Sequence, residues 1–360
     1  MAREPIFQQD VLLAPHTTMG LGGRARYFAA CQCIEEIRHC LVWARERGLR
    51  LQVLGGGSNT IFPDQGFDGL VVQINLQGVQ FEAQGEWVAV RAGAGEDWDA
   101  LVQRCIEHGL AGFECLSGIP GLVGATPIQN VGAYGQEVKD TITLVKALDR
   151  EKLDSIEFAN QACAFSYRQS RFKAADRDRY IITEVSYRLR QDGRPQLRYP
   201  ELQGYVEEHM DLERLESGRP VLSAVREAVV QLRRKKSMVI DPADPNTCSA
   251  GSFFLNPVLS EAQYQDLQQR WQPAGDRAAI PVFDAPGGFK VAAAWLVEQA
   301  GFHKGYSRGR AGISTRHALA LINRGGTSRE VLELAAEIQH GVYEKFGIHL
   351  DLEPVVVDGL

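Results

Sequence analysis

The spacing of apolar residues in the first part of the chain predicts helices and strands in alternation. Apolar side chains recur at intervals of three and four over residues 34–44, and Gly48 follows where a left-handed residue would end a helix. A strand is predicted over 51–54, with further strands near 71–75 and 88–90. A second amphipathic helix is predicted over 98–106, stopped by Gly109.

The middle of the chain is richer in strands. Residues 181–189 alternate between two sets of side chains, one mostly apolar and one more polar, as in a half-buried strand. Between residues 141 and 189, few apolar side chains follow the three- and four-residue spacing that marks a helix between strands. The pattern therefore predicts an α+β arrangement rather than repeated βαβ units.

A polar stretch interrupts the pattern over residues 190–220. It has few apolar anchors and is too long for an ordinary connection, so we expect a loop or a lid insertion there. A helix is predicted over 222–232, ending in the basic run Arg233, Arg234, Lys235 and Lys236. The Pro-rich segment 241–245 then marks a domain boundary.

The last third of the chain has two strong signals for helix starts. Ser260 with Gln263, and Thr327 with Glu330, each match a capping box, in which the two side chains bond to exposed backbone amides. A final strand is predicted over 348–357. Since 360 residues exceed the usual size of one hydrophobic core, two or three domains are expected.

Composition narrows the class of protein. Hydrophobic residues make up 44% and charged residues 23%, as in an ordinary globular protein, and the net charge of -6 argues against a general nucleic-acid binder. We see neither a secretion signal nor a run of about 18 apolar residues, so we expect a cytoplasmic protein with no membrane partner. The seven cysteines include no C-x-x-C pair, so reduced thiols and no metal site are expected.

Two glycine-rich loops are the best candidates for ligand binding. The first glycine loop, residues 55–59, follows a strand and reads Gly-Gly-Gly-Ser-Asn. The second glycine loop, residues 118–135, contains no charged side chain. Consecutive glycines let backbone amides approach a pyrophosphate closely. Neither loop matches the Rossmann or P-loop motif, and Gly93-Ala94-Gly95 is expected only to join a strand to a helix.

These loops, preceded by Thr17-Thr18-Met19-Gly20-Leu21-Gly22-Gly23, resemble the UDP-N-acetylenolpyruvoylglucosamine reductase (MurB) family, in its branch with a tyrosine loop. The similarity runs in order from about His16 to Val357. It implies an α+β fold with an FAD-binding part of the vanillyl-alcohol-oxidase (PCMH) type in two subdomains, 1–78 and 79–237. A C-terminal domain, 238–360, would bind substrate, with its last strand returning Glu353 to the active site.

The resemblance also implies non-covalent FAD, NADPH as the reductant, and a set of residues that hold the flavin. The FAD-binding residues implied by the two loops are Gly55, Gly56, Gly57, Ser58, Asn59, Gly118, Ile119, Pro120, Gly121, Gly124, Ala125, Gln129, Asn130, Gly132, Ala133 and Tyr134.

Three residues are expected to be catalytic. An Arg guanidinium offers paired donors to a carboxylate, and the resemblance makes Arg168, in Ser-Tyr-Arg-Gln-Ser, the stabiliser of an enolic intermediate. It makes Ser252, in Gly-Ser-Phe-Phe, the proton donor, and Glu353, in Leu-Glu-Pro, the partner of the arginine. Taken alone, each motif would be read instead as a surface salt-bridging arginine, a bend entering a buried strand or an exposed strand glutamate.

Substrate contacts are carried over in the same way. They are Tyr167, beside the arginine, Tyr199, Asn256, Lys304 and His317. Tyr199 falls in the polar stretch and corresponds to the tyrosine loop that closes over the UDP diphosphate. Lys236 is also a candidate, although a phosphate-facing role and a solvated helix end both remain open for it.

The implied reaction is NADPH-dependent reduction of UDP-N-acetylglucosamine enolpyruvate to UDP-N-acetylmuramate, by a monomeric enzyme of peptidoglycan precursor synthesis, a process linked to cell shape and division. One alternative is an oxidase of the same fold with a covalent flavin, for which His16 is the histidine nearest the early glycines. Another is a non-catalytic protein that binds a UDP-sugar or a flavin and acts as a regulator.

Overall fold

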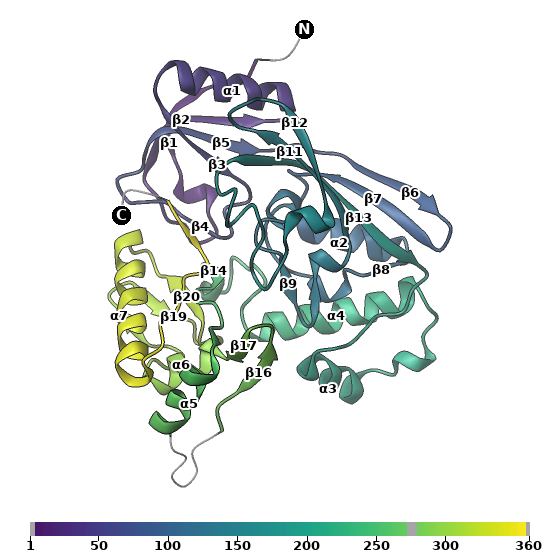
Figure 1. The fold of residues 1–360 in the computed structure, drawn as a ribbon, viewed down its shortest axis with the longest axis vertical. Helices are drawn as coiled ribbons and strands as arrows, with labels where there is room; N and C mark the ends of the chain where they lie inside the picture. Colours follow the sequence, from purple (N-terminus) through teal and green to yellow (C-terminus); the bar gives the residue numbers. More distant parts are fainter. Residues whose placement is uncertain (1–3, 272–278, 358–360) are drawn as a thin grey trace. The chain divides into compact units, whose positions relative to one another are not determined.

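The computed structural model describes residues 4–271 and 279–357 (Figure 1). The chain divides into two compact units. The first contains the segment that ends at Val11, together with Ala25–Gly56 and Phe67–Val239; the second contains Leu12–Arg24, Gly57–Gly66 and the segment that starts at Ile240. Two short N-terminal segments therefore belong with the C-terminal third. The expected domains, which are contiguous and divided at residues 78 and 237, do not include this arrangement. Residues 1–3, 272–278 and 358–360 of the expected domains lie outside the described residues.

The first unit begins with a sheet of strand order β1-β2-β5-β3, in which β2, β5 and β3 run parallel (Figure 1). Helix α1 packs on this sheet through a buried stripe that includes Ile37 and Leu41, and Gly48 follows it with φ +61°, as predicted. The bounds are β1 Gln8–Leu12, β2 Arg24–Cys31, α1 Ile34–Glu46, β3 Arg50–Leu54 and β5 Phe67–Ile74.

A larger antiparallel sheet follows, with the order β12-β11-β13-β7-β6 and β8 paired to β13. Strand β13 is more buried than the half-buried strand that was predicted, because β11 and β7 flank it and α2 covers it. The bounds are β6 Val79–Gln84, β7 Trp87–Gly93, α2 Trp98–Glu107, β8 Leu110–Ala111, β11 Ile142–Asp149, β12 Ser155–Ala159 and β13 Tyr180–Gln191.

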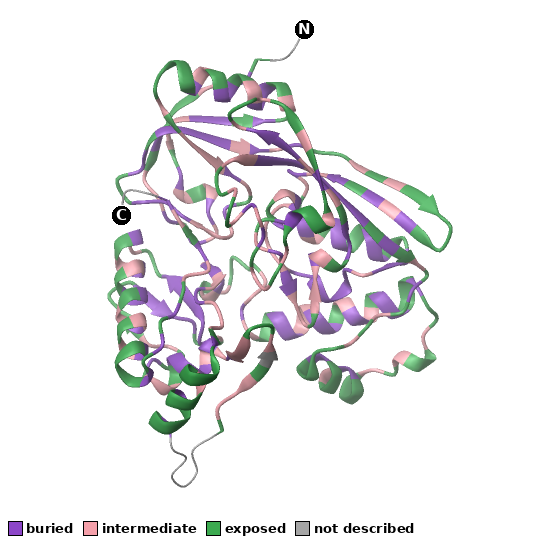
Figure 2. Ribbon diagram, in the orientation of Figure 1, coloured by how far each residue is buried: buried purple, intermediate pink, exposed green. Residues whose placement is uncertain are grey.

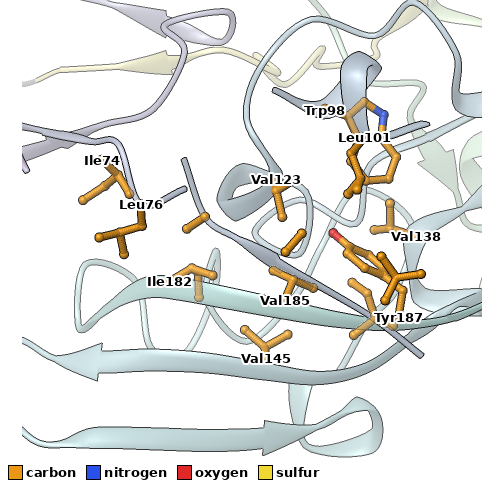
Figure 3. Close-up of a cluster of buried hydrophobic side chains, with 14 of the residues drawn as sticks. Ile74, Leu76, Trp98, Leu101, Val123, Val138, Val145, Ile182, Val185 and Tyr187 are labelled. Carbon is orange, nitrogen blue, oxygen red and sulfur yellow. The ribbon is translucent and has the colours of Figure 1, made fainter. Parts of the chain in front are cut away.

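The core of the first unit joins α2 to this sheet (Figure 3). Trp98 lies with its ring centroid 5.0 Å from that of Phe113, and Phe113 lies 4.9 Å from Tyr187. The Tyr187 hydroxyl is 3.0 Å from that of Thr126, which satisfies its polar group inside the core. Val123 also belongs to this cluster, so the second glycine loop is anchored in it by a buried side chain.

The prediction of a loop or lid over 190–220 was wrong in part, because helix α3 (Pro200–His209) forms there. Leu202 and Val206 of α3 are buried against α4 (Arg219–Lys235), together with Val225 and Val229. These apolar residues are spaced by four, and the surrounding charges hide the period in the sequence. Figure 2 shows the opposite side of α3 as exposed.

The second unit contains three short sheets and three helices within the described ranges. Helix α7 illustrates why its helices form: Thr327 and Glu330 make the predicted capping box, and Gly347 ends the helix with φ +69°. Ser260 and Gln263 cap α5 in the same way. The helices are α5 Glu261–Arg270, α6 Ala293–Gln299 and α7 Ser328–Phe346, and the strands are β4 Thr60–Ile61, β14 Ser249–Ser252, β15 Val258–Leu259, β16 Val282–Ala285, β17 Gly288–Val291, β18 Ser307–Arg308, β19 Ala311–Ile313, β20 Ala320–Asn323 and β21 Val355–Val356.

The predicted final strand over 348–357 is much shorter in the structure. Only β21 pairs regularly, in parallel with β4, while Leu352 makes a single bridge to Phe254. Pro354 lies between these two pairings, and it has no amide hydrogen with which to continue a ladder. The chain therefore changes partners at this residue.

Two further expectations concern the whole chain. All seven cysteines lie in the described part and are free thiols, with Cys31 Sγ 3.6 Å from Cys40 Sγ. Helices able to cross a membrane are absent from the part of the chain that the structure describes. Short 3₁₀ turns occur at Ala14–His16, Glu114–Leu116, Val123–Ala125, Val138–Asp140, Asn160–Cys163, Leu212–Arg214 and Pro245–Thr247.

Candidate active site

The first glycine loop depends on close backbone approach. A Cβ atom on Gly56 would lie 3.2 Å from the Cα of Gly121 in the second glycine loop. Gly57 has φ +65°, and a Cβ there would lie 1.9 Å from the carbonyl oxygen of His16. No other residue fits the Gly57 position without moving the backbone, which explains the glycine there.

The Thr17–Gly23 motif packs on the end of this loop within the second unit. The Thr18 amide donates to the Gly57 carbonyl at 3.2 Å. The Thr17 hydroxyl donates to Leu21 O at 2.9 Å and accepts from the Leu21 amide at 3.1 Å, which closes the motif on itself. The motif is therefore a support for Gly57–Asn59.

The second glycine loop begins with two residues in the left-handed region, Gly118 at φ +72° and Gly121 at φ +120°. Gly124 packs on the Gly93–Gly95 segment, because its Cβ would lie 2.6 Å from the Cβ of Ala94. The Gly93–Gly95 segment joins β7 to α2, as expected, and the Ala94 carbonyl accepts from the Gly124 amide at 2.9 Å. Ile119, Pro120, Ala125 and Gln129 lie along the same loop.

Asn130 occupies the centre of this loop and is fully buried, with φ +46°. Its amide nitrogen donates to Ser166 O at 2.9 Å and to the Glu137 carboxylate at 3.1 Å, while its oxygen accepts from the Lys139 amide at 3.1 Å. The Asn130 side-chain amide thus uses both its nitrogen and its oxygen in hydrogen bonds to other residues of the protein. Gly132 and Ala133 form β9 (Gly132–Ala133), which pairs with β10 (Gln136–Glu137), and Tyr134 follows β9 with φ +47°.

Arg168 sits on a tight turn held against the second glycine loop. Ser166 and Gln169 exchange backbone hydrogen bonds of 3.0 and 3.2 Å, and Arg168 adopts a positive φ of +53° between them. The Arg168 guanidinium donates to Gly132 O at 2.6 Å and to Asn130 O at 3.5 Å. Its carbon lies 5.6 Å from the centroid of the Tyr167 ring. A positive φ is uncommon for a residue other than glycine, and here the two backbone hydrogen bonds hold the conformation.

Both ends of this turn are anchored to the same loop. The Ser166 carbonyl accepts from Asn130, and the buried Ser170 hydroxyl donates to Ile128 O at 2.5 Å. Neither anchor uses the Arg168 side chain. The guanidinium is therefore presented by a turn whose position is fixed by other residues.

A partly buried ionic network behind Gly118 was missed by the sequence analysis. Asp99 accepts two hydrogen bonds from Arg226, at 2.6 and 2.7 Å, and one from the Gly118 amide at 2.6 Å. Burial alone would raise the pKa of Asp99, but these hydrogen bonds outweigh it and hold the pKa below the usual carboxyl value. Arg233 donates to Gly118 O at 3.2 Å and to Met238 O at 2.8 Å.

These ionic residues come from α2 and α4, far apart in the sequence. Burial lowers the pKa of Arg233, although a guanidinium stays charged at neutral pH. Because Arg233 lies on the buried side of α4, it is not part of the solvated basic end that the run 233–236 suggested. The repeating apolar positions of α4 could have indicated this, since Arg233 falls four residues after Val229.

Three expected ligand-binding residues gather at the end of α4. Lys236 caps this helix, and its Nζ lies 5.7 Å from the centroid of the Tyr134 ring. Tyr199 precedes α3 and meets Tyr134 edge-on with centroids 5.5 Å apart. Burial raises the pKa of Tyr134 to about 12 and also raises that of Tyr199, so both hydroxyls remain protonated donors at neutral pH.

Ser252 and Glu353 are brought to neighbouring segments of the second unit. Ser252 ends β14, and the Glu353 amide donates to the carbonyl of the next residue, Phe253, at 2.9 Å. Asn59 of the first glycine loop donates through Nδ2 to Glu353 O at 3.2 Å. The structure therefore places Ser252 and Glu353 on neighbouring segments, and the Glu353 segment contacts Asn59.

The remaining expected contacts also lie in the second unit. Asn256 accepts from the Ala293 amide at 2.8 Å, so its oxygen caps the start of α6. His317 Nδ1 accepts from the Leu319 amide at 3.0 Å, which leaves the proton of the neutral ring on Nε2. Lys304 is exposed, with Nζ 3.9 Å from the Glu298 carboxylate. Clusters of three metal-ligating side chains do not occur among residues 4–271 and 279–357.

The geometry of the loops fits a dinucleotide. The first unit brings the backbones of Gly56 and Gly121 close together without a charged side chain on either loop, as a pyrophosphate held by backbone amides requires. Gly118 and Gly121 have positive φ values, which glycine adopts without steric cost. The buried Arg233 behind Gly118 adds positive potential suited to an anion.

Comparison with known proteins gives two family matches along the chain. Residues 25–151, which hold both glycine loops, match the model of an FAD binding domain. Residues 242–357, which hold Ser252 and Glu353, match the model of the C-terminal domain of UDP-N-acetylenolpyruvoylglucosamine reductase.

Whole-length relatives agree with these matches. The UDP-N-acetylenolpyruvoylglucosamine reductase of Thermobifida fusca is 44% identical over 357 residues, 98% of each chain. That of Streptomyces coelicolor is 45% identical over 363 residues, 98% of this chain and 91% of the relative. The crystal structure of the MurB enzyme from Thermus caldophilus superposes with a TM-score of 0.64 at 25% identity, over 98% of both chains.

Proposed function

The chain belongs to the UDP-N-acetylenolpyruvoylglucosamine reductase family, and from this premise we propose how its residues reduce the enolpyruvyl ether of UDP-N-acetylglucosamine to UDP-N-acetylmuramate with NADPH. This is an FAD-dependent step of peptidoglycan precursor synthesis. The observation that carries the residue assignment is the Arg168 turn, which lies on the second glycine loop with the guanidinium 2.6 Å from Gly132 O.

When bound, FAD would supply the redox chemistry, the transfer of hydride from NADPH to the terminal vinyl carbon of the sugar substrate. Both glycine loops would hold the cofactor through their backbones. Addition of hydride to the vinyl carbon leaves negative charge spread into the adjacent carboxylate. Arg168 stabilises that enolic charge, because a guanidinium pairs with both oxygens of a carboxylate.

Ser252 then donates the proton to the carbon next to the carboxylate, and Glu353 acts with Arg168 on the enolic species. A serine hydroxyl is a weak acid, so this transfer requires a strongly basic acceptor in a site that excludes water. Arg168 belongs to the first unit, and Ser252 and Glu353 belong to the second.

Substrate binding is assigned to Tyr167, Tyr199, Lys236, Asn256, Lys304 and His317. The grouping of Tyr199 and Lys236 around Tyr134 supports a role for both in binding the diphosphate. We assign the two sheets of the first unit to two FAD-binding subdomains, and the C-terminal part from about residue 238 to substrate binding. We further propose a cytoplasmic monomer, and light scattering coupled to gel filtration would test the oligomeric state.

The proton-donor role is tested by measuring each half of the reaction separately. In a Ser252→Ala variant, anaerobic reduction of the flavin by NADPH should proceed at nearly the wild-type rate. Reoxidation by the enolpyruvyl sugar should fall by about a hundredfold or more, as expected for loss of a general acid. Equal loss in both halves would show that Ser252 supports the flavin rather than donating a proton.

The mode of FAD attachment has a simpler test. Acid or heat denaturation followed by filtration should release all of the flavin, because we assign it as non-covalent. Flavin that stayed with the polypeptide would favour the oxidase alternative, and a protein that binds the sugar without sugar-dependent NADPH consumption would favour a regulator.

A further inference from the structure

A carboxylate lies among the residues assigned to the substrate diphosphate. Glu201, in the first turn of α3, places Oε2 2.6 Å from Lys236 Nζ. The same Lys236 lies over the Tyr134 ring, which contacts the ring of Tyr199. Glu201 follows Tyr199 by two residues, so the segment that bears Tyr199 also bears the carboxylate that pairs with Lys236.

One ammonium group cannot pair fully with both this carboxylate and a diphosphate. Two anions brought to the same cation repel each other, and the repulsion is stronger where water is partly excluded. Two neighbouring cations are committed elsewhere, since Arg233 donates to Gly118 O and Met238 O, and Lys235 lies over the Tyr205 ring at 4.7 Å. Binding of the diphosphate at Lys236 therefore competes with Glu201 and favours its release.

Two features make this release possible. The side chains of Glu201 and Lys236 are 37% and 32% exposed, so solvent can reach the pair and it can separate without unfolding α3. Glu201 also stands at the N-terminal end of a ten-residue helix, where exposed amides favour a negative charge. The carboxylate thus keeps a favourable environment after it loses Lys236.

We propose that Glu201 sets the affinity of this enzyme for its sugar substrate by occupying Lys236 in place of the diphosphate. This inference rests on the proposed function, because it takes Lys236 as a diphosphate contact. Glu201 is an affinity-determining residue and has no part in hydride or proton transfer.

The test is a Glu201→Gln variant of the FAD-loaded enzyme. The KM for the enolpyruvyl sugar should fall about two- to fivefold, the range expected when a partly exposed ion pair no longer has to be broken. The value of kcat should change by less than about twofold, because the reacting atoms keep their partners. Titration with UDP-N-acetylmuramate, followed by the flavin absorbance, should show a matching decrease in the dissociation constant.

The matched control is Glu207→Gln, which removes the same charge from the same helix at an exposed position. It should leave the KM within about 1.5-fold of the wild-type value, the smallest effect expected from a surface charge. If the two variants behave alike, or if Glu201→Gln raises the KM, the inference is overturned. A raised KM would mean that Glu201 orients Lys236 for the substrate.

A second comparison isolates the pair itself. In a Lys236→Gln background, the further change Glu201→Gln should leave kcat/KM for the sugar unaltered, because the lysine that mediates the effect is gone. A gain from Glu201→Gln that persists in this background would overturn the inference in favour of general charge repulsion. A wild-type enzyme without sugar-dependent NADPH oxidation would instead refute the proposed function.

Discussion

The Arg168 turn and helix α3 both carry residues assigned to the substrate, yet the protein holds them in different ways. The turn is fixed by buried polar bonds from Asn130 and Ser170 to the second glycine loop. Helix α3 is held by a small apolar patch around Leu202 and by the partly exposed pair of Glu201 with Lys236. Tyr199, at the start of α3, is 39% exposed.

This difference matches the work that each region would perform. A group that stabilises developing charge has to be in place before the reaction, since reorganising it would add to the barrier. A residue that closes over a substrate has to move, and elements held by few buried contacts open at low cost. We therefore expect changes at the turn to affect kcat, and changes at α3 to affect KM and local stability.

The largest effect is expected from Arg168→Lys. Lysine keeps the positive charge but cannot offer two parallel donors to a carboxylate, so kcat with the sugar should fall about a hundredfold. The turn should keep its position, because neither of its anchors uses the Arg168 side chain. Stopped-flow measurement of flavin reoxidation gives the rate, and fluorescence titration should give an unchanged FAD affinity.

The control for this variant is Arg171→Lys, three residues further along. Arg171 pairs with Asp176 and lies over the Phe158 ring. Its replacement should leave kcat within about twofold, since lysine keeps the charge beside Asp176 and the contacts that are weakened involve none of the residues assigned to the reaction. Comparable losses in the two variants would contradict a special role for the Arg168 turn.

A smaller effect is expected behind the same loop, at Asp99. Removal of this carboxylate in Asp99→Ala leaves Arg226 and the Gly118 amide without their partner, and should cost about 2–3 kcal/mol of unfolding free energy, less than for a fully buried pair. FAD should also bind more weakly. Asp97→Ala, which removes only the α2 cap, should cost about 1 kcal/mol and makes a matched control in urea unfolding.

Helix α3 should respond locally rather than globally. Leu202→Ala removes a fully buried side chain from the small patch on α4, and should loosen α3 by about 2 kcal/mol. Hydrogen exchange should then become faster over 200–209, and the KM for the sugar should rise with little change in kcat. The comparison is Leu101→Ala in the large core, which should lower the overall Tm. A global loss in both variants would remove the distinction between the two regions.

The smallest effect concerns pH. Because the folded pKa of Asp99 is depressed, its contribution to stability is present above the unfolded carboxyl pKa of about 3.9 and is lost as the pH falls through the folded value. The difference in unfolding free energy between wild type and Asp99→Asn should be constant from about pH 7 to 5 and shrink below about pH 4. A difference that did not change on acidification would show that the pKa of Asp99 is the same in the folded and unfolded protein.

Much of the fold could be predicted because the signals are local. The capping boxes of α5 and α7 and the glycines that end α1 and α2 follow from residues a few positions apart. Helix α3 was not predicted because its two buried residues can be recognised as a packing face only when α4 covers them. The last strand was predicted too long because its partners, β4 and Phe254, lie in distant parts of the printed sequence.

The sequence by itself determined the family, the two glycine loops and the motifs of Arg168, Ser252 and Glu353, because these depend on residue types at fixed short spacings. Only the tertiary structure decided that Asn130 holds the Arg168 turn, that Asp99 and Arg226 hold Gly118, and that Glu201 reaches Lys236. Such contacts join side chains from distant segments, and a buried charge or amide is satisfied by whichever partner the packing brings within hydrogen-bond distance.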